Sequence, residues 1–177
     1  LVRGDVLETD LSAWGPCVIT GNLPYYITSP ILAKTLRLGP LLRRGVFLVQ
    51  KDLAVRAASA PGRREYGYLS VFCQAQASVD ILFSIPPGAF RPPPQVWSAL
   101  LRLVPRRLNE EIDGQSLIAF LEFAKTCFRM KRKTLRNNLE GHVPAELLEG
   151  CPEISLRAEQ LSVEELWRLY RRLTKRA

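Results

Sequence analysis

Histidine is nearly absent from this sequence: His142 is the only one among 177 residues, and it stands in a Gly-His-Val-Pro stretch. A Ser-His-Asp triad and a His-ligated zinc site both need histidines that the chain does not supply, so we expect neither, and no metal site. Cysteine is also scarce. The four cysteines have no C-x-x-C spacing and stand among apolar neighbours, as the reduced thiols of an intracellular protein do: Cys17, Cys73, Cys127 and Cys151.

Long hydrophobic runs are missing as well. No stretch of about 18 apolar residues occurs, and no charged segment followed by an apolar one opens the chain. These absences predict a soluble, cytoplasmic protein with no membrane partner. The chain begins Leu-Val-Arg-Gly-Asp and contains a single methionine, Met130, so we expect the sequence to be part of a longer protein.

The composition is that of a globular protein with a strong positive charge. Apolar residues make up 47% of the chain and charged residues 24%, which is enough apolar material for a core. Lysine and arginine number 25 against 17 acidic residues, a formal net charge of +8. This imbalance favours an anionic partner without saying which anion.

Short apolar runs alternate with helical patterns in the first hundred residues. The runs predict strands over 2–7, 17–20, 45–50, 78–85 and 96–104. The patterns between them predict helices over 51–60, over 68–77 and over 29–38, the last with Ser29 as N-cap and Pro30 as first helical residue. Strands alternating with helices predict an open α/β sheet, and the final two strands predict an antiparallel hairpin at its edge.

The strand signal ends after residue 104. The polar segment 105–112 predicts a linker, and a capping box formed by Ser162 and Glu165 precedes a last amphipathic helix. We therefore predict a sheet domain over 1–104 and a small all-α domain over 113–177, in a monomeric protein. Apolar residues with helical spacing mark the first helix of the second domain, from near residue 113: Leu117, Leu121, Ala124 and Phe128.

The stretch Asn22-Leu23-Pro24-Tyr25 follows a predicted buried strand, and open α/β sheets bind ligands at the carboxyl ends of their strands. Asn22 and Leu23 offer a carboxamide oxygen and a main-chain carbonyl, Pro24 a rigid turn, and Tyr25 a flat aromatic face. Two acceptors beside an aromatic ring suit the exocyclic amine of a base, whose delocalised lone pair must be turned toward an electrophile. The same residues are also compatible with a plain strand-to-helix turn that buries a tyrosine.

Along nearly its whole length the sequence resembles the ribosomal RNA adenine N6,N6-dimethyltransferase family, the small-subunit enzymes whose loss gives kasugamycin resistance. Many matching pieces in the same order are more specific than any single motif. They are residues 4–7, 22–30, 50–51, 66–71, 86–99 and 132–137. The resemblance implies a partial Rossmann-like methyltransferase sheet followed by a helical domain, with S-adenosylmethionine as cofactor.

The resemblance also implies roles for single residues. Asp5, with Val6 beside it, matches the acidic residue that binds the adenine amine of S-adenosylmethionine, and Asn22 also lies near the cofactor. Asn22 and the Leu23 carbonyl match the acceptors for the target amine. Tyr25 matches the aromatic that stacks on a flipped adenine, and Phe90 the aromatic that closes the pocket from the other side. Taken alone, Asp5 is more typical of a turn and Phe90 of loop packing.

Six basic residues and no acidic one occur between positions 125 and 136. Their helical spacing predicts one basic face on a helix. Such a face can simply be solvated, but four like charges in one stripe favour contact with the phosphates of RNA. The stripe consists of Arg129, Arg132, Lys133 and Arg136. A second basic cluster, at 168–176, is also explained by the dipole of the last helix.

A glycine-rich loop with G-x-G spacing does not occur in this chain. The resemblance implies that this loop and an acidic ribose-binding residue precede Asp5 by some tens of residues. We therefore expect the chain by itself to bind S-adenosylmethionine weakly or not at all, and to be inactive.

For the intact protein the resemblance implies methylation of two adjacent adenines near the 3′ end of small-subunit rRNA, within an assembling small ribosomal subunit. One alternative is an erythromycin-resistance type enzyme that acts on large-subunit rRNA. Leu23, where those enzymes more often carry Ile, and the continuation Thr28-Ser29-Pro30 favour the small-subunit interpretation. Another alternative is a non-catalytic RNA-binding or assembly factor, or a mitochondrial transcription factor of the same family.

Overall fold

The structure is a computed structural model that describes residues 2–106 and 114–174. Packing divides the chain into two compact units. The first comprises Leu1–Ala58 with Gln76–Arg107, and the second comprises Ser59–Ala75 with Leu108–Ala177.

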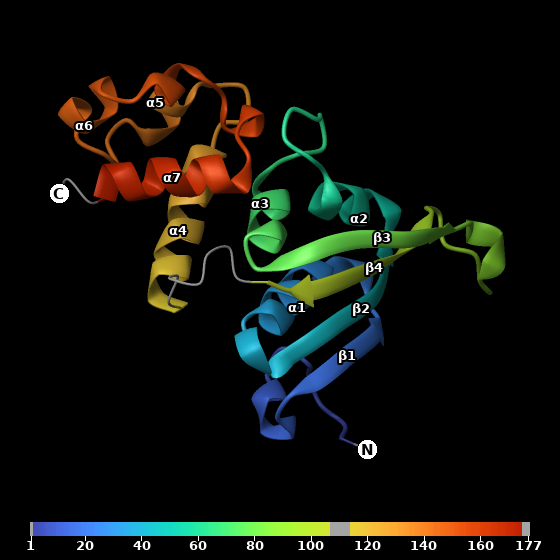
Figure 1. The fold of residues 1–177 in the computed structure, drawn as a ribbon. Coiled ribbons are helices and arrows are strands. Elements are labelled where there is room, and N and C mark those ends of the chain that lie inside the picture. Colours follow the sequence, from blue (N-terminus) through green and yellow to red (C-terminus); the bar gives the residue numbers. More distant parts are fainter. Residues whose placement is uncertain (1, 107–113, 175–177) are drawn as a thin grey trace. The chain divides into compact units, whose positions relative to one another are not determined.

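The first unit is built on a four-stranded mixed sheet with the order β1-β2-β4-β3 (Figure 1). β1 (Cys17–Asn22) and β2 (Leu42–Gln50) are parallel, and α1 (Thr28–Leu36) connects them. β4 (Ser98–Pro105) runs antiparallel to β2 and to β3 (Ala77–Ile85). The predicted antiparallel hairpin at the edge of the sheet is therefore confirmed.

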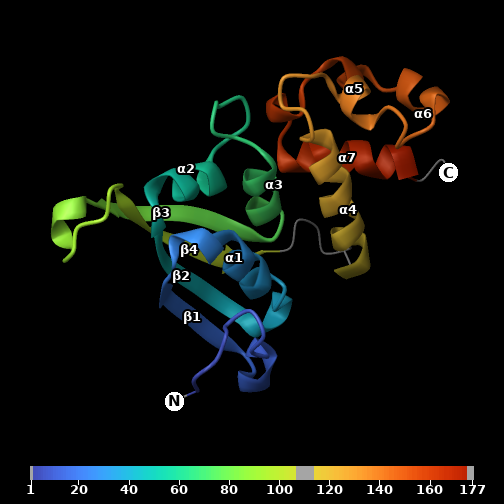
Figure 2. The ribbon, with the colours of Figure 1, turned by 180° about the vertical axis from the view of Figure 1, so that it is seen from behind.

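One face of this sheet supplies most of the buried side chains. Along β2 and β4, Phe47, Val49, Leu101 and Leu103 are buried, whereas the residues that alternate with them are only half-buried. α1 and α2 (Lys51–Ala58) pack against the sheet, and α1 lies in front of β2 when the sheet is seen from behind (Figure 2). The period of two along each strand thus separates a core face from a more open one.

Two local predictions in this unit were wrong. Residues 2–7 form a turn and not a strand, because the Asp5 carboxylate accepts a hydrogen bond from the Leu7 N–H at 2.8 Å and bends the backbone. The N-cap of α1 is Ile27, two residues ahead of Ser29. The Thr28 hydroxyl donates to the Pro24 carbonyl at 3.0 Å, and α1 begins at Thr28. Ser29, the expected N-cap, is therefore already a helical residue.

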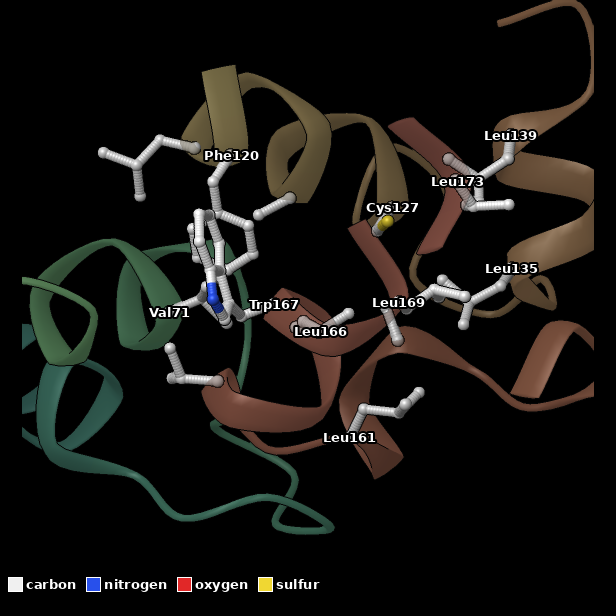
Figure 3. Close-up of a cluster of buried hydrophobic side chains, with 14 of the residues drawn as sticks. Val71, Phe120, Cys127, Leu135, Leu139, Leu161, Leu166, Trp167, Leu169 and Leu173 are labelled. Atoms are coloured by element: carbon white, nitrogen blue, oxygen red, sulfur yellow. The ribbon is translucent and has the colours of Figure 1, made fainter. Parts of the chain in front are cut away.

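The second unit consists of helices around an apolar core (Figure 3). Phe120 and Trp167 lie edge to face in this core, with ring centroids 5.1 Å apart. Ser162 and Glu165 form the predicted capping box, with reciprocal bonds of 2.7 and 3.1 Å. The α-helices of the unit are α3 (Tyr68–Gln74), α4 (Gly114–Cys127), α5 (Leu135–Leu139), α6 (Ala145–Glu149) and α7 (Val163–Thr174).

Residues 59–75 belong by packing to this helical unit, although the sequence pattern predicts them in the sheet domain 1–104. Tyr66 and Val71 are fully buried in the helical core, which explains the difference. The predicted linker 105–112 lies outside the described residues from 107 onward, as does the predicted helix start at 113.

The thiols of the chain are free, and Cys73, Cys127 and Cys151 are buried. Burial raises the pKa of the Cys73 and Cys127 thiols to about 12, so both are protonated at neutral pH. Among the helices that the structure describes, none combines the length and the apolar character needed to cross a membrane.

Candidate functional site

One edge of the sheet gathers the segments that carry the sequence motifs. Asn22, the last residue of β1, is paired in register with Leu48 of β2. Gln50 at the end of β2 is paired with Ser98 at the start of β4, and Ser98 with Ile85 at the end of β3. The Asn22 turn, helix α2 and the loop between β3 and β4 therefore all start at the same edge, where open α/β sheets bind their ligands.

The turn from Asn22 to Tyr25 is fixed on both sides. The Leu23 N–H donates to the Leu48 carbonyl at 3.0 Å, and the Leu23 side chain is buried. Pro24 holds an extended backbone, and its carbonyl accepts from the Ile27 N–H at 3.2 Å. Asn22 remains exposed, and no hydrogen bond among the described residues uses its carboxamide or the Leu23 carbonyl. The two predicted acceptors are therefore adjacent, and neither is used by a hydrogen bond among the described residues.

Tyr25 is half-buried and tied to the sheet through its hydroxyl. The Tyr25 hydroxyl lies 2.9 Å from the Ser98 Oγ, across 73 positions of sequence. Ser98 itself is only 1% exposed. No role for Ser98 was predicted from the sequence, although it stands inside one of the family-like stretches; only the pairing of β2 with β4 places it beside Tyr25.

Asp5 is exposed, and Val6 half-buried, in the turn that precedes β1. The Thr9 hydroxyl donates to the Asp5 carbonyl at 2.8 Å, and the Lys34 ammonium donates to the Leu7 carbonyl at 2.7 Å. These bonds hold the turn against α1. The structure thus gives Asp5 the geometry of a turn residue, and its role toward a cofactor stays a prediction.

Phe90 lies in the loop between β3 and β4, directly after the short 3-10 helix Pro87–Ala89. Its side chain is half-buried, and its N–H donates to the Pro87 carbonyl at 3.1 Å. The loop starts and ends at the same sheet edge as the Asn22 turn. The prediction that Phe90 closes a base pocket opposite Tyr25 stays a prediction.

The four residues of the basic stripe do not share a helical face. α4 ends at Cys127, and Arg129, Arg132 and Lys133 lie in the loop that follows, whereas Arg136 lies in α5. All four side chains are exposed. The prediction of one helical stripe was therefore wrong. Residues 129–136, a loop together with the first two residues of α5, are called the basic loop from here on.

A buried asparagine explains the shape of the basic loop. The Asn138 side chain, 1% exposed, accepts from the Met130 N–H at 2.8 Å and donates to the Met130 carbonyl at 3.2 Å. It also donates to the Thr134 carbonyl at 3.3 Å. These bonds take the place of helical hydrogen bonds and fold the chain back between α4 and α5.

Lys51 and Trp97 form a second pair at the sheet edge, which was not predicted from the sequence. The Lys51 ammonium lies 5.0 Å from the centroid of the Trp97 indole, and the Lys51 N–H donates to the Trp97 carbonyl at 2.9 Å. Lys51 is exposed and the Trp97 side chain is 49% exposed.

Comparisons with known proteins agree with this arrangement. The family model of ribosomal RNA adenine dimethylase matches residues 1–175. The chain belongs to this family. Among its dimethylase relatives, the ribosomal RNA small subunit methyltransferase A of Acidobacterium capsulatum is 41% identical over the whole chain. The chain spans 66% of the length of that protein, just under two thirds.

Two solved structures share the fold of this chain. A dimethyladenosine transferase from Plasmodium falciparum superposes with a TM-score of 0.77 at 24% identity, covering 95% of this chain and 70% of that one. The 23S rRNA methyltransferase ErmE gives 0.71 at 24% identity, covering 97% and 70%. The predicted fold class, a Rossmann-like α/β sheet followed by helices, is confirmed.

Proposed function

We propose that the full-length protein transfers methyl groups from S-adenosylmethionine to N6 of two adjacent adenines near the 3′ end of small-subunit rRNA, in an assembling subunit. The observation that carries the proposal is the Asn22–Tyr25 turn, with two unoccupied acceptors beside a tethered aromatic ring at the carboxyl end of β1. The 41% identity to a protein named ribosomal RNA small subunit methyltransferase A supports the substrate.

The chemistry of an adenine amine explains what these residues contribute. Its lone pair is delocalised into the ring, so the amine attacks poorly until that lone pair is drawn out of conjugation. The Asn22 carboxamide oxygen and the Leu23 carbonyl accept the two amine hydrogens and aim the lone pair at the methyl donor. Tyr25 stacks on the flipped base from one side and Phe90 from the other, which offsets the few kcal/mol that extrusion costs.

The residues present fit the adenosine end of S-adenosylmethionine. The Asp5 carboxylate is exposed, and among the described hydrogen bonds only its Oδ1 is used, by the Leu7 N–H, which leaves an oxygen for an exocyclic amine. We assign Asp5, Val6 and Asn22 to this ligand. When bound, it supplies a methyl group activated by the adjacent sulfonium.

The basic loop supplies the contacts to the RNA backbone. Arg129, Arg132, Lys133 and Arg136 are exposed and present four positive charges on a backbone fixed by Asn138. We assign them to the phosphates of the rRNA, which they recognise by shape and charge and not by base sequence.

A large-subunit specificity has less support. The similarity to ErmE, at 24% identity, concerns the fold alone. The experiment that separates the two incubates the full-length protein with labelled S-adenosylmethionine and either assembling small subunits or large-subunit rRNA. We expect N6,N6-dimethyladenosine in the small-subunit RNA; label in the large-subunit RNA alone would overturn the proposed substrate, and a persistent absence of label would overturn the activity.

A further inference from the structure

A half-exposed indole directly precedes the residue that holds Tyr25. Trp97 is followed by Ser98, whose Oγ lies 2.9 Å from the Tyr25 hydroxyl. The position of Trp97 is fixed through the main chain, because its carbonyl accepts the Lys51 N–H at 2.9 Å. The backbone of Trp97 is therefore fixed one residue before the group that holds the proposed base platform, and the described contact of the indole itself is with the Lys51 ammonium.

Packing does not account for this indole. Trp167 is 9% exposed and lies in the helical core, as a structural tryptophan does, whereas Trp97 leaves about half of its side chain, 49%, to solvent. A large aromatic exposed beside a ligand edge is a candidate contact surface.

The Lys51 ammonium beside the indole is a positive charge without a carboxylate partner among the ion pairs of the described residues. Its described contact is the Trp97 ring, at 5.0 Å. A cation and an aromatic face side by side are the two groups with which proteins hold single-stranded nucleic acid: the base stacks on the ring and the charge meets its phosphate.

We propose that Lys51 and Trp97 form a subsite for the nucleotide adjacent to the target adenine. Its base stacks on the Trp97 indole while the target base occupies the Tyr25 platform, and the Lys51 ammonium binds the phosphate that joins the two nucleotides. The assignment rests on the proposed function, since it takes the Tyr25 site as the place of the target base. In each methyl transfer, the nucleotide held by Lys51 and Trp97 is the neighbour of the adenine that receives the methyl group.

The test asks whether the contribution of Trp97 to RNA affinity depends on the base next to the target adenine. The affinity of the full-length protein and of Trp97→Ala is measured for a short substrate RNA, and for the same RNA with an abasic residue on the 5′ or the 3′ side of the target adenine. We expect Trp97→Ala to weaken binding of the intact RNA by about 5- to 150-fold, the range of one stacked base, and to leave binding of one abasic RNA unchanged. Trp97→Phe should restore most of the loss.

Trp14→Ala is the matched control. Trp14 is 57% exposed and precedes β1, at the opposite end of the strand from Asn22, so its loss should change the affinity for none of the RNAs. Lys51→Met should lower the slope of log affinity against log salt by about one.

The outcomes also separate this proposal from the proposed function. Suppose that Trp97→Ala weakens binding of the intact RNA and of both abasic RNAs equally, while changes at Asn22 still abolish methylation. That result would overturn the subsite and leave the proposed function unaffected. If the affinity loss of Trp97→Ala depends on the neighbouring base, but the protein methylates no RNA, the subsite is supported and the proposed function is overturned.

Discussion

The Tyr25 hydroxyl and the Ser98 Oγ lie 2.9 Å apart, although 73 positions separate the two residues in sequence. Ser98 is buried at the start of β4, so it is a fixed point to which the phenol is tied. This single bond sets the direction in which the Tyr25 ring faces the sheet edge.

Ser98→Ala should lower kcat/KM for methylation by the full-length protein about three- to tenfold, the value of one hydrogen bond. Tyr25→Phe removes the same bond from the other side and keeps the ring. The double variant should be no worse than the poorer single variant, because both changes remove one shared interaction. Additive losses in this cycle would contradict a positioning role for Ser98.

Replacing Arg129, Arg132, Lys133 and Arg136 together with alanine should weaken rRNA binding and flatten its salt dependence. Because four charges would no longer neutralise phosphates, the slope of log affinity against log salt should fall by about three. The control removes Arg171 from the last turn of α7, where the charge complements the helix dipole; this change should leave the slope as it is. A slope unchanged in the fourfold variant would remove the basic loop from the interface.

Asn138→Ala should lower the free energy of unfolding by about 1–3 kcal/mol, because the Met130 N–H and carbonyl lose a buried partner. Asn137→Ala is the matched control, since Asn137 is exposed and its side chain accepts only from the Thr134 hydroxyl, at 2.7 Å, among the bonds of the described residues. Urea unfolding measures the free energy of unfolding of both variants. If the two variants lose stability equally, Asn138 does not organise the basic loop.

The capping box of α7 gives the protein a stability that depends on pH. The bond from the Ser162 N–H to the carboxylate lowers the pKa of Glu165 below its ordinary value. A carboxyl whose pKa is depressed by folding stabilises the protein above its unfolded pKa of about 4.3, and this contribution is lost as the pH falls through the folded pKa. Glu165→Gln keeps the acceptor but cannot titrate, so its stability should fall less than that of the unaltered protein between pH 6 and about pH 3. Parallel curves for the two proteins in urea titrations would rule the contribution out.

Patterns that depend on neighbours in sequence were predictable. Continuous or alternating apolar runs located the four strands β1 to β4, and the spacing of Ser162 and Glu165 located the start of α7. The Asn22 turn was also found, since its motif is continuous.

Features that depend on distant contacts were not predictable. The basic residues have helical spacing, yet Arg129, Arg132 and Lys133 lie in a loop, which Asn138 holds by a bond to Met130, eight positions earlier. Ser98 reaches Tyr25 only because β4 lies beside β2, and a sequence contains no direct signal for that order. Residues 2–7 have strand-like composition, but the Asp5 carboxylate bends them into a turn.

The decisive measurement compares the full-length protein with its Asn22→Ala variant in the rate at which each forms N6,N6-dimethyladenosine in small-subunit RNA. Asn22 is exposed, so Asn22→Ala should leave the melting temperature unchanged. It should lower the rate of methylation about 100-fold or more, as the loss of a group that acts on the transition state does. Methylation at an undiminished rate would contradict the claim that this carboxamide holds the target amine.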